Sequence, residues 1–255
     1  MSKSQRLRLS DVREVFHLLG ECRDLELDFQ NWQRHMLQAL CRLLRSQLAI
    51  GGEMIWTGPH RMMVPIHCEN YRVNPAKWPE YAEWLKDPRI FINAAICNFH
   101  GLRQRQSTRS RQQLVDDREF YRCPFFNEIL KPGGFDHGML SRYVLGPGRR
   151  MHELVFNRVV GEPAFGQRDC RMLQLFHDEL GPAVERSLGL FRLAPRLRQT
   201  LEALLQGDSE KQAALRLGLS VHTVHEYVTA LYRRFDVSSR PELLARFLRY
   251  KRSHG

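Results

Sequence analysis

The stretch from Ser209 to Phe235 constrains the fold most, because it predicts two short helices joined by a tight turn. Ser209 is a favourable N-cap for the first helix, and Gly218 can adopt the positive φ needed just past a helix end. Ser220 can cap a second helix, whose apolar stripe is Val224, Val228, Leu231 and Phe235. Two helices joined in this way form a helix-turn-helix, whose second helix enters the major groove of DNA.

Further motifs flank this turn at fixed spacing. They are Leu193–Arg196, Leu201–Lys211, Ala214, Leu217–Ser220, Thr223–Val224, Tyr232–Phe235, Val237 and Ser239–Arg240. Together they resemble the DNA-binding domain of LuxR-type transcription regulators, over residues 192–250. The resemblance implies an all-α four-helix domain at 191–255 with a recognition helix at 220–235. The sequence departs from the family at Leu197, His225 and Tyr227, so the resemblance does not imply a preferred DNA sequence.

Matching the family position by position implies which side chains meet DNA. His225, Glu226 and Thr229 are expected at base edges, where glutamate can accept from cytosine and histidine can donate to guanine. The side chains expected at the phosphate backbone are Ser209, Lys211, Ser220, Thr223, Arg233, Arg234 and Arg240. For each of them, an ordinary solvated surface residue is the alternative.

The last helix, expected from Ser239 to about Tyr250, has two candidate roles. Its apolar residues Leu243, Leu244 and Phe247 can cover the small helical core, and the family resemblance also implies a dimerisation surface there. We therefore expect a homodimer on DNA, with two half-sites about 34–36 Å apart.

Charge and composition agree with a nucleic-acid partner. Thirty-nine Lys and Arg against 28 Asp and Glu give a formal charge of +11, which favours double-stranded DNA as a polyanionic partner. No run approaches the roughly 20 apolar residues of a membrane span, and residues 1–11 lack the apolar core of a signal peptide. The six cysteines form no CxxC pair, which indicates reduced thiols. A cytoplasmic protein is expected.

The first 190 residues alternate between helical and strand-like patterns. A helix is expected from an N-cap at Ser10 to Gly20, with Val12, Val15, Phe16 and Leu19 on its buried face. The other expected elements are helices at 25–46, 74–86, 117–130 and 167–191, with the helical stretch resuming in mainly apolar residues at 90–99 after a break at Asp87-Pro88. Strands are expected at 48–56 and 62–68, an exposed loop leading into a strand at 101–115, and a hairpin of 135–145 with 151–160. This order predicts an α+β sandwich with an antiparallel sheet.

Several short segments of this region also match a known type of domain. They are Asp117–Tyr121, Phe126–Glu128, Asn157–Arg158 and Phe165–Asp169. They resemble the GAF-like sensory domains that precede LuxR-type modules. The resemblance implies a GAF/PAS-like sandwich at 1–190 that senses a signal.

A cluster of aromatic residues is the candidate ligand pocket of this domain. The residues are Trp56, Tyr71, Trp78, Tyr81 and Trp84, and a plain core role is the alternative. Part of this segment slightly resembles the autoinducer-binding domains of quorum-sensing regulators, although the spacing of their aromatic and aspartate residues is not reproduced. Two alternatives to a general sensor therefore stay open: a receptor for an acyl-homoserine lactone, and a constitutive DNA-binding protein whose first domain only dimerises.

Other function classes lack their motifs. The sequence contains no GxSxG, P-loop or HExxH motif, so no enzyme is expected. The adjacent acidic pair Asp116-Asp117 comes too late in the chain for a phosphorylated receiver domain. His67, Cys68 and His137 lack a second ligand pair, so neither a metal nor a cofactor is expected. The arginines of 103–111 are interpreted as a solvated loop, with a second nucleic-acid patch as the alternative.

Overall fold

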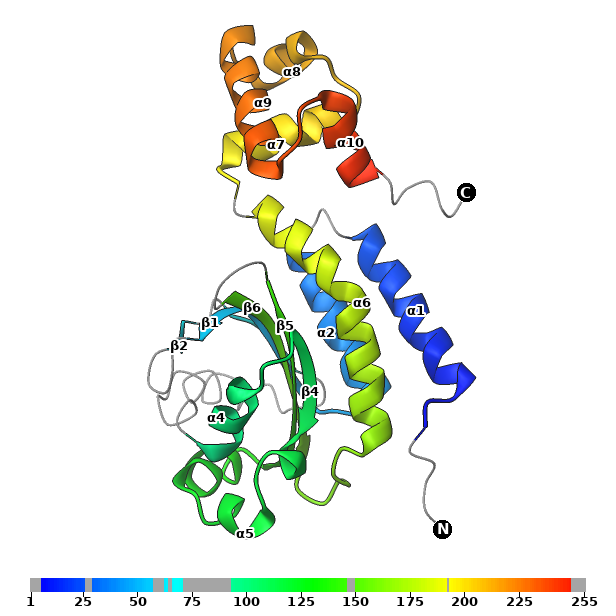
Figure 1. Ribbon diagram of the computed structural model, residues 1–255, viewed down its shortest axis with the longest axis vertical. Helices are drawn as coiled ribbons and strands as arrows, with labels where there is room; N and C mark the ends of the chain where they lie inside the picture. Colours follow the sequence, from blue (N-terminus) through cyan, green and yellow to red (C-terminus); the bar gives the residue numbers. More distant parts are fainter. Residues whose placement is uncertain are drawn as a thin grey trace. The chain divides into compact units, whose positions relative to one another are not determined.

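The structure is a computed structural model in which the chain forms two compact units, Met1–Glu185 and Arg186–Gly255 (Figure 1). It describes residues 6–25, 29–56, 62–63, 66–70, 93–145, 150–191 and 193–248, and only the backbone at 29–30, 54–56, 62–63, 66–70, 185–191 and 246–248. Within these ranges no helix is both long enough and apolar enough to cross a membrane.

The N-terminal unit is built on one antiparallel sheet. Its strands are β1 (Leu48–Trp56), β2 (Met62–Met63), β3 (Ile66–Asn70), β4 (Gln106–Ser110), β5 (Phe135–Val144) and β6 (Arg150–Val159). The order is β2-β1-β6-β5-β4, and β3 also pairs with β1. The expected hairpin of β5 with β6 is confirmed, and so is the strand at 48–56. At the centre of the sheet, β1 pairs with the distant β6, with Leu48 opposite Asn157.

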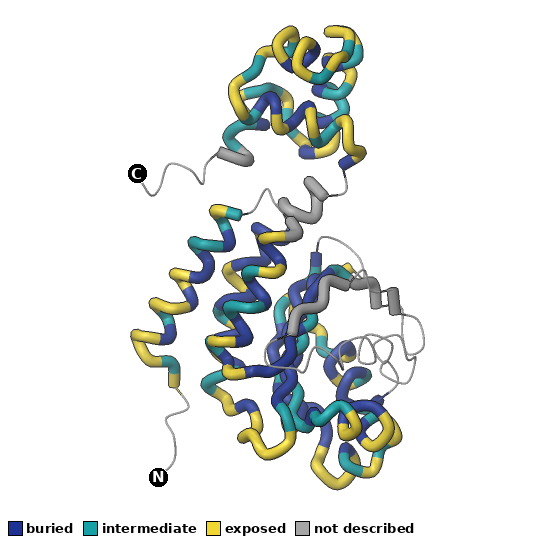
Figure 2. The backbone as a smooth tube through the Cα atoms, turned by 180° about the vertical axis from the view of Figure 1, so that it is seen from behind, coloured by how far each residue is buried: buried dark blue, intermediate teal, exposed yellow. Residues whose placement is uncertain are grey.

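Helices lie on both sides of this sheet, as expected for an α+β sandwich. On one side are α1 (Leu9–Asp24), α2 (Phe29–Leu44) and α6 (Gln167–Phe191), and on the other are α4 (Ala94–Gly101) and α5 (Asp117–Phe120) (Figure 1). The buried faces of α2 and α6 point toward the sheet (Figure 2). A Cβ on Gly51 of β1 would lie 2.8 Å from Leu37 of α2, so glycine permits the close approach of this helix.

A buried polar network lies between the sheet and α6. Ser141 Oγ of β5 is 2.7 Å from His177 Nδ1 of α6, and Thr108 Oγ1 of β4 is 2.7 Å from Ser141 Oγ. His177 Nε2 is in turn 3.0 Å from His152 Nδ1 of β6. Both imidazoles are fully buried, and burial lowers the pKa of His152 to about 3 and that of His177 well below its usual value. The network therefore joins three strands to α6 with both histidines neutral.

A second buried cluster lies on the opposite face of the sheet, beneath α4. Arg142 of β5 donates to the carbonyl oxygens of His100, at 3.1 Å, and of Leu102, and so it satisfies the C-terminal end of α4. Glu153 Oε2 of β6 is 3.3 Å from His100 Nε2. Burial raises the pKa of Glu153 to about 8 and lowers that of His100 to about 3, so both groups are mainly uncharged at neutral pH.

The prediction for the first helix is wrong at both ends. The helix begins at Leu9 with Arg8 as its N-cap, and it continues through Gly20 to Asp24. Asp11 decides the start, because its carboxylate accepts from Arg8 N at 2.8 Å and forms an ion pair with Arg168 of α6. Phe16 was expected on the buried face but is 49% exposed.

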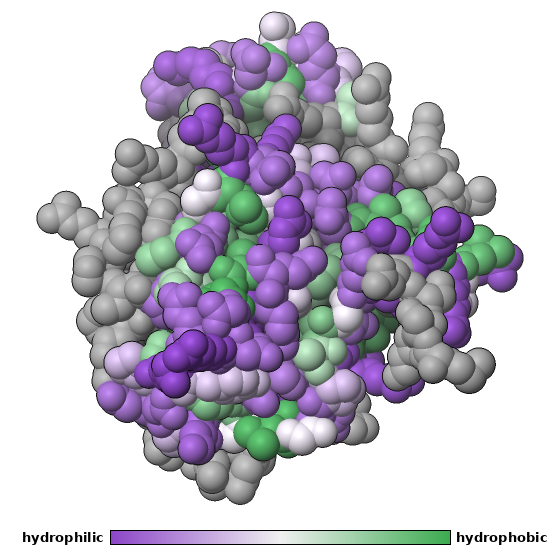
Figure 3. Space-filling view, turned by 60° about the horizontal axis from the view of Figure 1, so that its bottom comes forward, coloured by the Kyte–Doolittle hydropathy of each residue, from purple (hydrophilic) through white to green (hydrophobic). Residues whose placement is uncertain are grey.

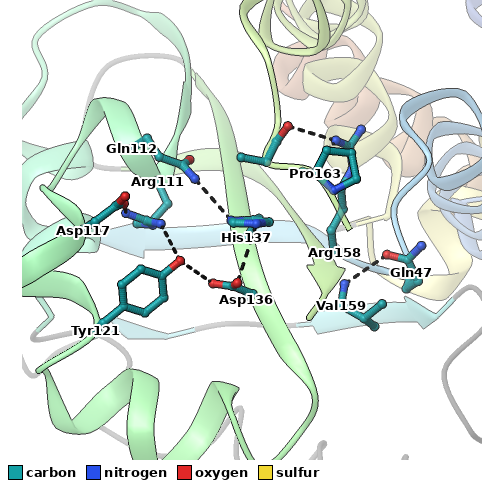
Figure 4. Close-up of polar contacts among 11 residues, drawn as sticks. Gln47, Arg111, Gln112, Asp117, Tyr121, Asp136, His137, Arg158, Val159 and Pro163 are labelled. Carbon is teal, nitrogen blue, oxygen red and sulfur yellow. Dashed lines mark hydrogen bonds and ion pairs between the residues drawn. The ribbon is translucent and has the colours of Figure 1, made fainter. Parts of the chain in front are cut away.

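The segment expected as an exposed, arginine-rich loop contains the edge strand β4. Ser107, Thr108 and Ser110 point into the unit and are buried, so small hydroxyl side chains stand where a strand usually shows hydrophobic ones. Arg111 is also buried and pairs with Asp117, while its other amino group lies 3.3 Å from Tyr121 Oη (Figure 4). A buried arginine with these partners cannot belong to a surface patch for nucleic acid.

The same close-up shows how the start of β5 is attached to the segment after β4. Tyr121 Oη donates to Asp136 at 2.9 Å, and Gln112 Nε2 lies 3.2 Å from His137 Nδ1 (Figure 4). His137, considered above as a metal ligand, is therefore engaged by neighbouring side chains.

Figure 4 also shows Arg158 donating to the carbonyl oxygen of Pro163, at 2.9 Å.

The helix expected at 117–130 is two elements. These are α5 and a π-helical turn, η4 (Phe126–Leu130), and the break falls before Pro124. Proline has no backbone N–H to continue the hydrogen bonds of the preceding turn, so it suits the start of a new helical segment. The helix expected at 74–86 lies outside the described residues.

The C-terminal unit contains four helices within residues 193–248: α7 (Pro195–Leu205), α8 (Glu210–Leu217), α9 (Val221–Phe235) and α10 (Arg240–Leu248).

The face of the molecule drawn in Figure 3 is mainly hydrophilic, with hydrophobic residues in scattered patches. Large apolar side chains that are exposed include Phe16 in the first unit and Leu215 in the second. Isolated exposures of this kind are ordinary.

Candidate nucleic-acid interface

The C-terminal unit has its own hydrophobic core, which holds α9 against the other helices. The predicted stripe of Val224, Val228, Leu231 and Phe235 is buried. It packs with Leu193, which precedes α7, and with residues of α7, α8 and α10: Leu201, Ala203, Leu204, Ala213, Ala214 and Leu243. Because Ala213 and Ala214 are small, α8 and α9 can pack closely. The opposite face of α9 points away from this core.

The turn between α8 and α9 has the geometry that its sequence predicted. Gly218 ends α8 with φ 64° and ψ 39°, in the left-handed region, and Leu219 N donates to Ala214 O at 2.9 Å. Ser209 begins α8 with a capping box, in which Ser209 Oγ accepts from Gln212 N and Gln212 Oε1 accepts from Ser209 N. The helix-turn-helix is therefore specified by local interactions at both ends of α8.

Ser220 and Thr223 define the start of α9. Ser220 Oγ accepts from Thr223 N at 3.0 Å and lies 2.8 Å from Thr223 Oγ1. The Ser220 hydroxyl thus caps the N-terminus and the Thr223 hydroxyl contacts it, at the end where the partial positive charge of a helix favours phosphate. Contact with a phosphate would have to be made alongside this capping role, or by the neighbouring backbone N–H groups.

The outward face of α9 carries two histidine–carboxylate pairs. His225 Nδ1 lies 3.1 Å from Glu210 Oε2 of α8, and these side chains are 65% and 34% exposed. His222 Nε2 lies 3.6 Å from Glu226 Oε1, one turn away on α9. The candidate base-contacting groups His225 and Glu226 are therefore solvent-accessible but already have partners, which DNA would have to replace.

Thr229 differs from His225 and Glu226, the other two predicted base contacts. It is half-buried, and its Oγ1 donates to the carbonyl oxygen of His225 at 3.0 Å. The hydroxyl hydrogen is used within the helix, so only an oxygen lone pair and the methyl group remain for a base. His222, by contrast, was missed in the sequence analysis although it is highly exposed. Its position four residues before Glu226, on the same helical face, was the available signal.

The predicted phosphate-binding cations fall into two groups. Lys211, Arg233 and Arg234 are exposed, and among the described contacts of this unit none of them forms an ion pair. Arg240 is half-buried and donates to the carbonyl oxygen of Leu204 at 3.3 Å, so it joins α10 to the end of α7. Arg216, which was not predicted, reaches Asp208 at 3.0 Å and fixes the loop before α8.

The predicted dimerisation residues of α10 are not equivalent. Leu243 is fully buried in the core of the unit, which is the core-covering role that the sequence offered as the alternative to dimerisation. Leu244 is half-buried, and the side chain of Phe247 lies outside the described residues.

The predicted aromatic pocket of the N-terminal unit also falls outside the described part of the chain. Tyr71, Trp78, Tyr81 and Trp84 belong to a segment that is not described, and only the backbone of Trp56 is described, in β1. His67 and Cys68 are described in their backbone alone, in β3.

Residues 192–247 match the family of bacterial regulatory proteins called the luxR family. This match includes α7, α8 and α9 and most of α10, and so it confirms the assignment made from the sequence motifs. The C-terminal unit is a luxR-type helix-turn-helix domain. The match does not extend into the N-terminal unit, and no curated protein matches the chain.

Solved structures that resemble the chain include that of SdiA from Escherichia coli, at 14% identity over 87% of this chain and 91% of that chain, with a TM-score of 0.41. SdiA in complex with octanoyl-rac-glycerol has 16% identity over 89% and 93%, with a TM-score of 0.44. The VqmA–ligand–DNA complex from Vibrio cholera has 22% identity over 46% and 49%, with a TM-score of 0.22.

Proposed function

We propose that this chain is a transcription regulator whose α9 enters the major groove of double-stranded DNA. The observation that carries the proposal is the outward face of α9, with His222, His225 and Glu226 exposed on a luxR-type helix-turn-helix whose other face is buried. A helix held in this way presents side chains to base edges without exposing its core. A regulator of this kind would act where DNA is accessible, in the bacterial cytoplasm.

Within this proposal, two kinds of side chain have different roles. His225, Glu226, Thr229 and the added His222 face base edges and set sequence preference. Lys211, Arg233 and Arg234 neutralise phosphates, and the backbone N–H groups at the N-terminus of α9 bind a further phosphate. From Arg192 onward the chain has twelve Lys and Arg against six Asp and Glu, so the DNA-binding unit itself is positively charged.

The test is a binding titration on duplexes selected from random DNA by the full chain. His225→Ala should change the ranking of duplexes, because it removes a base-contacting group. Lys211→Ala should weaken binding to all duplexes alike and lower the slope of log K against log salt by about 1. Arg198→Ala on α7 is the matched control, because it removes the same charge outside the helix-turn-helix.

The assignment of α9 fails if His225→Ala leaves the ranking unchanged and Lys211→Ala behaves like Arg198→Ala. The wider proposal of DNA binding fails if the chain selects no duplex even at low salt. The two results are distinguishable, because the first still leaves a bound complex to measure.

We also propose that the regulator binds as a homodimer, with α10 as one contributing surface, where Leu244 is only half-buried within its own unit. Support comes from α10, which is only partly covered by its own unit. Sedimentation of the full chain on a selected duplex should give a two-to-one complex. A one-to-one complex on a duplex with two half-sites would contradict the proposal.

The N-terminal unit is proposed as the signal-sensing part, with a GAF-like sandwich. The antiparallel sheet between two helical layers supports this proposal. An acyl-homoserine lactone receptor and a purely dimerising domain are the competing proposals. Thermal unfolding of the full chain with metabolites and with lactones separates them, since a ligand that binds only the folded state raises the unfolding temperature. Stabilisation by lactones alone would favour the quorum-sensing proposal, and no stabilisation by any compound would favour the dimerising domain.

A further inference from the structure

The N-terminal unit contains a cavity outside the helix-turn-helix, between the start of α4 and the region of α5. Its volume is about 390 Å³, within the range of small-molecule sites. The lining includes two thiols, Cys97 and Cys123, and one carboxylate, Glu119. Most of the other lining residues are apolar, among them Phe120 and Phe125. Figure 1 shows α4 and α5 near each other on the same side of the sheet.

The two cavity thiols differ from the other cysteines whose side chains are described. Cys22, Cys41 and Cys170 are buried, whereas Cys97 and Cys123 are partly exposed. Burial raises the pKa of Cys22 to about 12 and also raises the pKa of Cys170. Since the thiolate is the reactive form of cysteine, these two buried residues are inert at neutral pH. The solvent-accessible thiols among the described side chains are the two that face the cavity.

Separate elements hold these two thiols. Cys97 lies in the first turn of α4, whose start is fixed by Asn93 Oδ1 accepting from Ile96 N at 3.1 Å. Cys123 lies at the break before Pro124, and its Sγ accepts from Phe126 N at 3.4 Å. Both cysteines therefore lie at the fixed ends of helical segments, and both line the same mostly apolar cavity.

We propose that this cavity binds small apolar α,β-unsaturated carbonyl compounds and that Cys97 or Cys123 adds to them covalently. The sulfur forms a bond to the β-carbon, the C=C π bond is lost, and the thiol proton is transferred to the α-carbon. The product is a saturated thioether, with no leaving group and no oxidant. The apolar lining binds the carbon skeleton, and the partial exposure of the thiols gives the compound access.

The surroundings favour this chemistry over metal binding. A soft metal would require at least three suitable ligands, and the described residues contain no group of three His, Cys, Asp or Glu that could hold an ion. The cavity does not depend on DNA binding by the C-terminal unit, so this proposal and the proposed function are tested independently.

The test uses the full chain carrying Cys68→Ser, because the side chain of Cys68 is not described. The probe is 2-cyclohexen-1-one, with adducts located by intact mass and peptide mapping. Modification should occur first at Cys97 or Cys123, and its rate should saturate as the probe fills the cavity. Cyclohexanone, which has the same skeleton but no C=C bond, should slow the reaction. Cys97→Ser combined with Cys123→Ser should abolish this fast phase, and 8 M urea should make Cys22, Cys41 and Cys170 reactive too.

Three results would overturn the proposal. The first is a rate that rises linearly with probe and is indifferent to cyclohexanone, which describes ordinary surface thiols. The second is early modification of Cys22, Cys41 or Cys170 in the folded protein. The third is loss of both thiols to a Cys97–Cys123 disulfide when a peroxide is added, with no adduct from the enone. The single Ser variants then identify which thiol carries any adduct.

Discussion

Acidification should destabilise the N-terminal unit through His152. Burial holds the pKa of this imidazole at about 3, against 6.5 in the unfolded chain. Below pH 6.5 the His152 side chain therefore binds a proton in the unfolded chain but not in the folded protein. The stability that His152 contributes is complete above pH 6.5 and is lost as the pH falls toward 3. Between pH 7.5 and 5.0 this linkage lowers the free energy of unfolding by about 2 kcal/mol.

Other buried groups titrate over the same range, so the slope of the wild-type protein alone is not diagnostic. His100, whose pKa is lowered to about 3, and His177, whose pKa burial lowers well below its usual value, add losses of the same sign. Glu153 acts in the opposite direction, because its pKa is raised from 4.5 to about 8. Its stabilising contribution is complete below pH 4.5 and is lost as the pH rises through 8. Comparing the wild type with a His152 variant cancels these effects.

The informative variant is His152→Gln, since glutamine cannot titrate and keeps a hydrogen-bonding group near His177. Urea unfolding at pH 7.5 and 5.0 can be followed by tryptophan fluorescence, because Trp32, Trp56, Trp78 and Trp84 all belong to the N-terminal unit. Relative to wild type, the variant should gain about 2 kcal/mol on going to pH 5.0. His17→Gln, at a side chain 77% exposed, is the matched histidine substitution at the surface. Equal pH dependence in His152→Gln and wild type would refute the reasoning.

Gly181→Ala should lower the free energy of unfolding of the N-terminal unit, measured with urea, by about 1–3 kcal/mol, because the added Cβ would lie 2.1 Å from the Tyr143 ring. Gly20→Ala, in an open position of α1, should instead raise this free energy by about 0.5–1 kcal/mol. Equal effects of the two substitutions would contradict this prediction. Gly218→Val should lower the stability of the helix-turn-helix by about 1–2 kcal/mol, measured by amide hydrogen exchange in α9, since φ is +64° there. Ser220→Ala should cost about 1 kcal/mol in the same assay, through loss of the α9 cap; unchanged exchange in either variant would be inconsistent with these roles.

The helix-turn-helix was predictable because its determinants are local. Ser209, Gly218 and Ser220 act on backbone groups within four residues of themselves, and the apolar stripe of α9 follows the helical period. The same holds for α6, whose expected span at 167–191 agrees with the structure.

The sequence-based predictions that failed depend on contacts between residues far apart in the chain. The start of α1 depends on Asp11, which is held by Arg168 at a sequence separation of 157 residues. Strand β4 lacks the hydrophobic alternation of a strand, because Thr108 is buried through a polar network with Ser141 rather than through apolar packing. Within the DNA-binding unit, the pairing of His225 with Glu210 and of Arg240 with the Leu204 carbonyl required the relative placement of helices.

The place of β1 in the sheet has a consequence for synthesis of the chain. Its neighbour β6 begins at Arg150, 94 residues after β1 ends at Trp56. At the usual pace of translation, about 5–20 residues per second, β1 is made roughly 5–20 s before β6 and has an unpaired side throughout. An unpaired strand is a template for association with other chains. Nascent copies halted between these two strands should therefore recruit chaperones or aggregate more than copies halted after Val159.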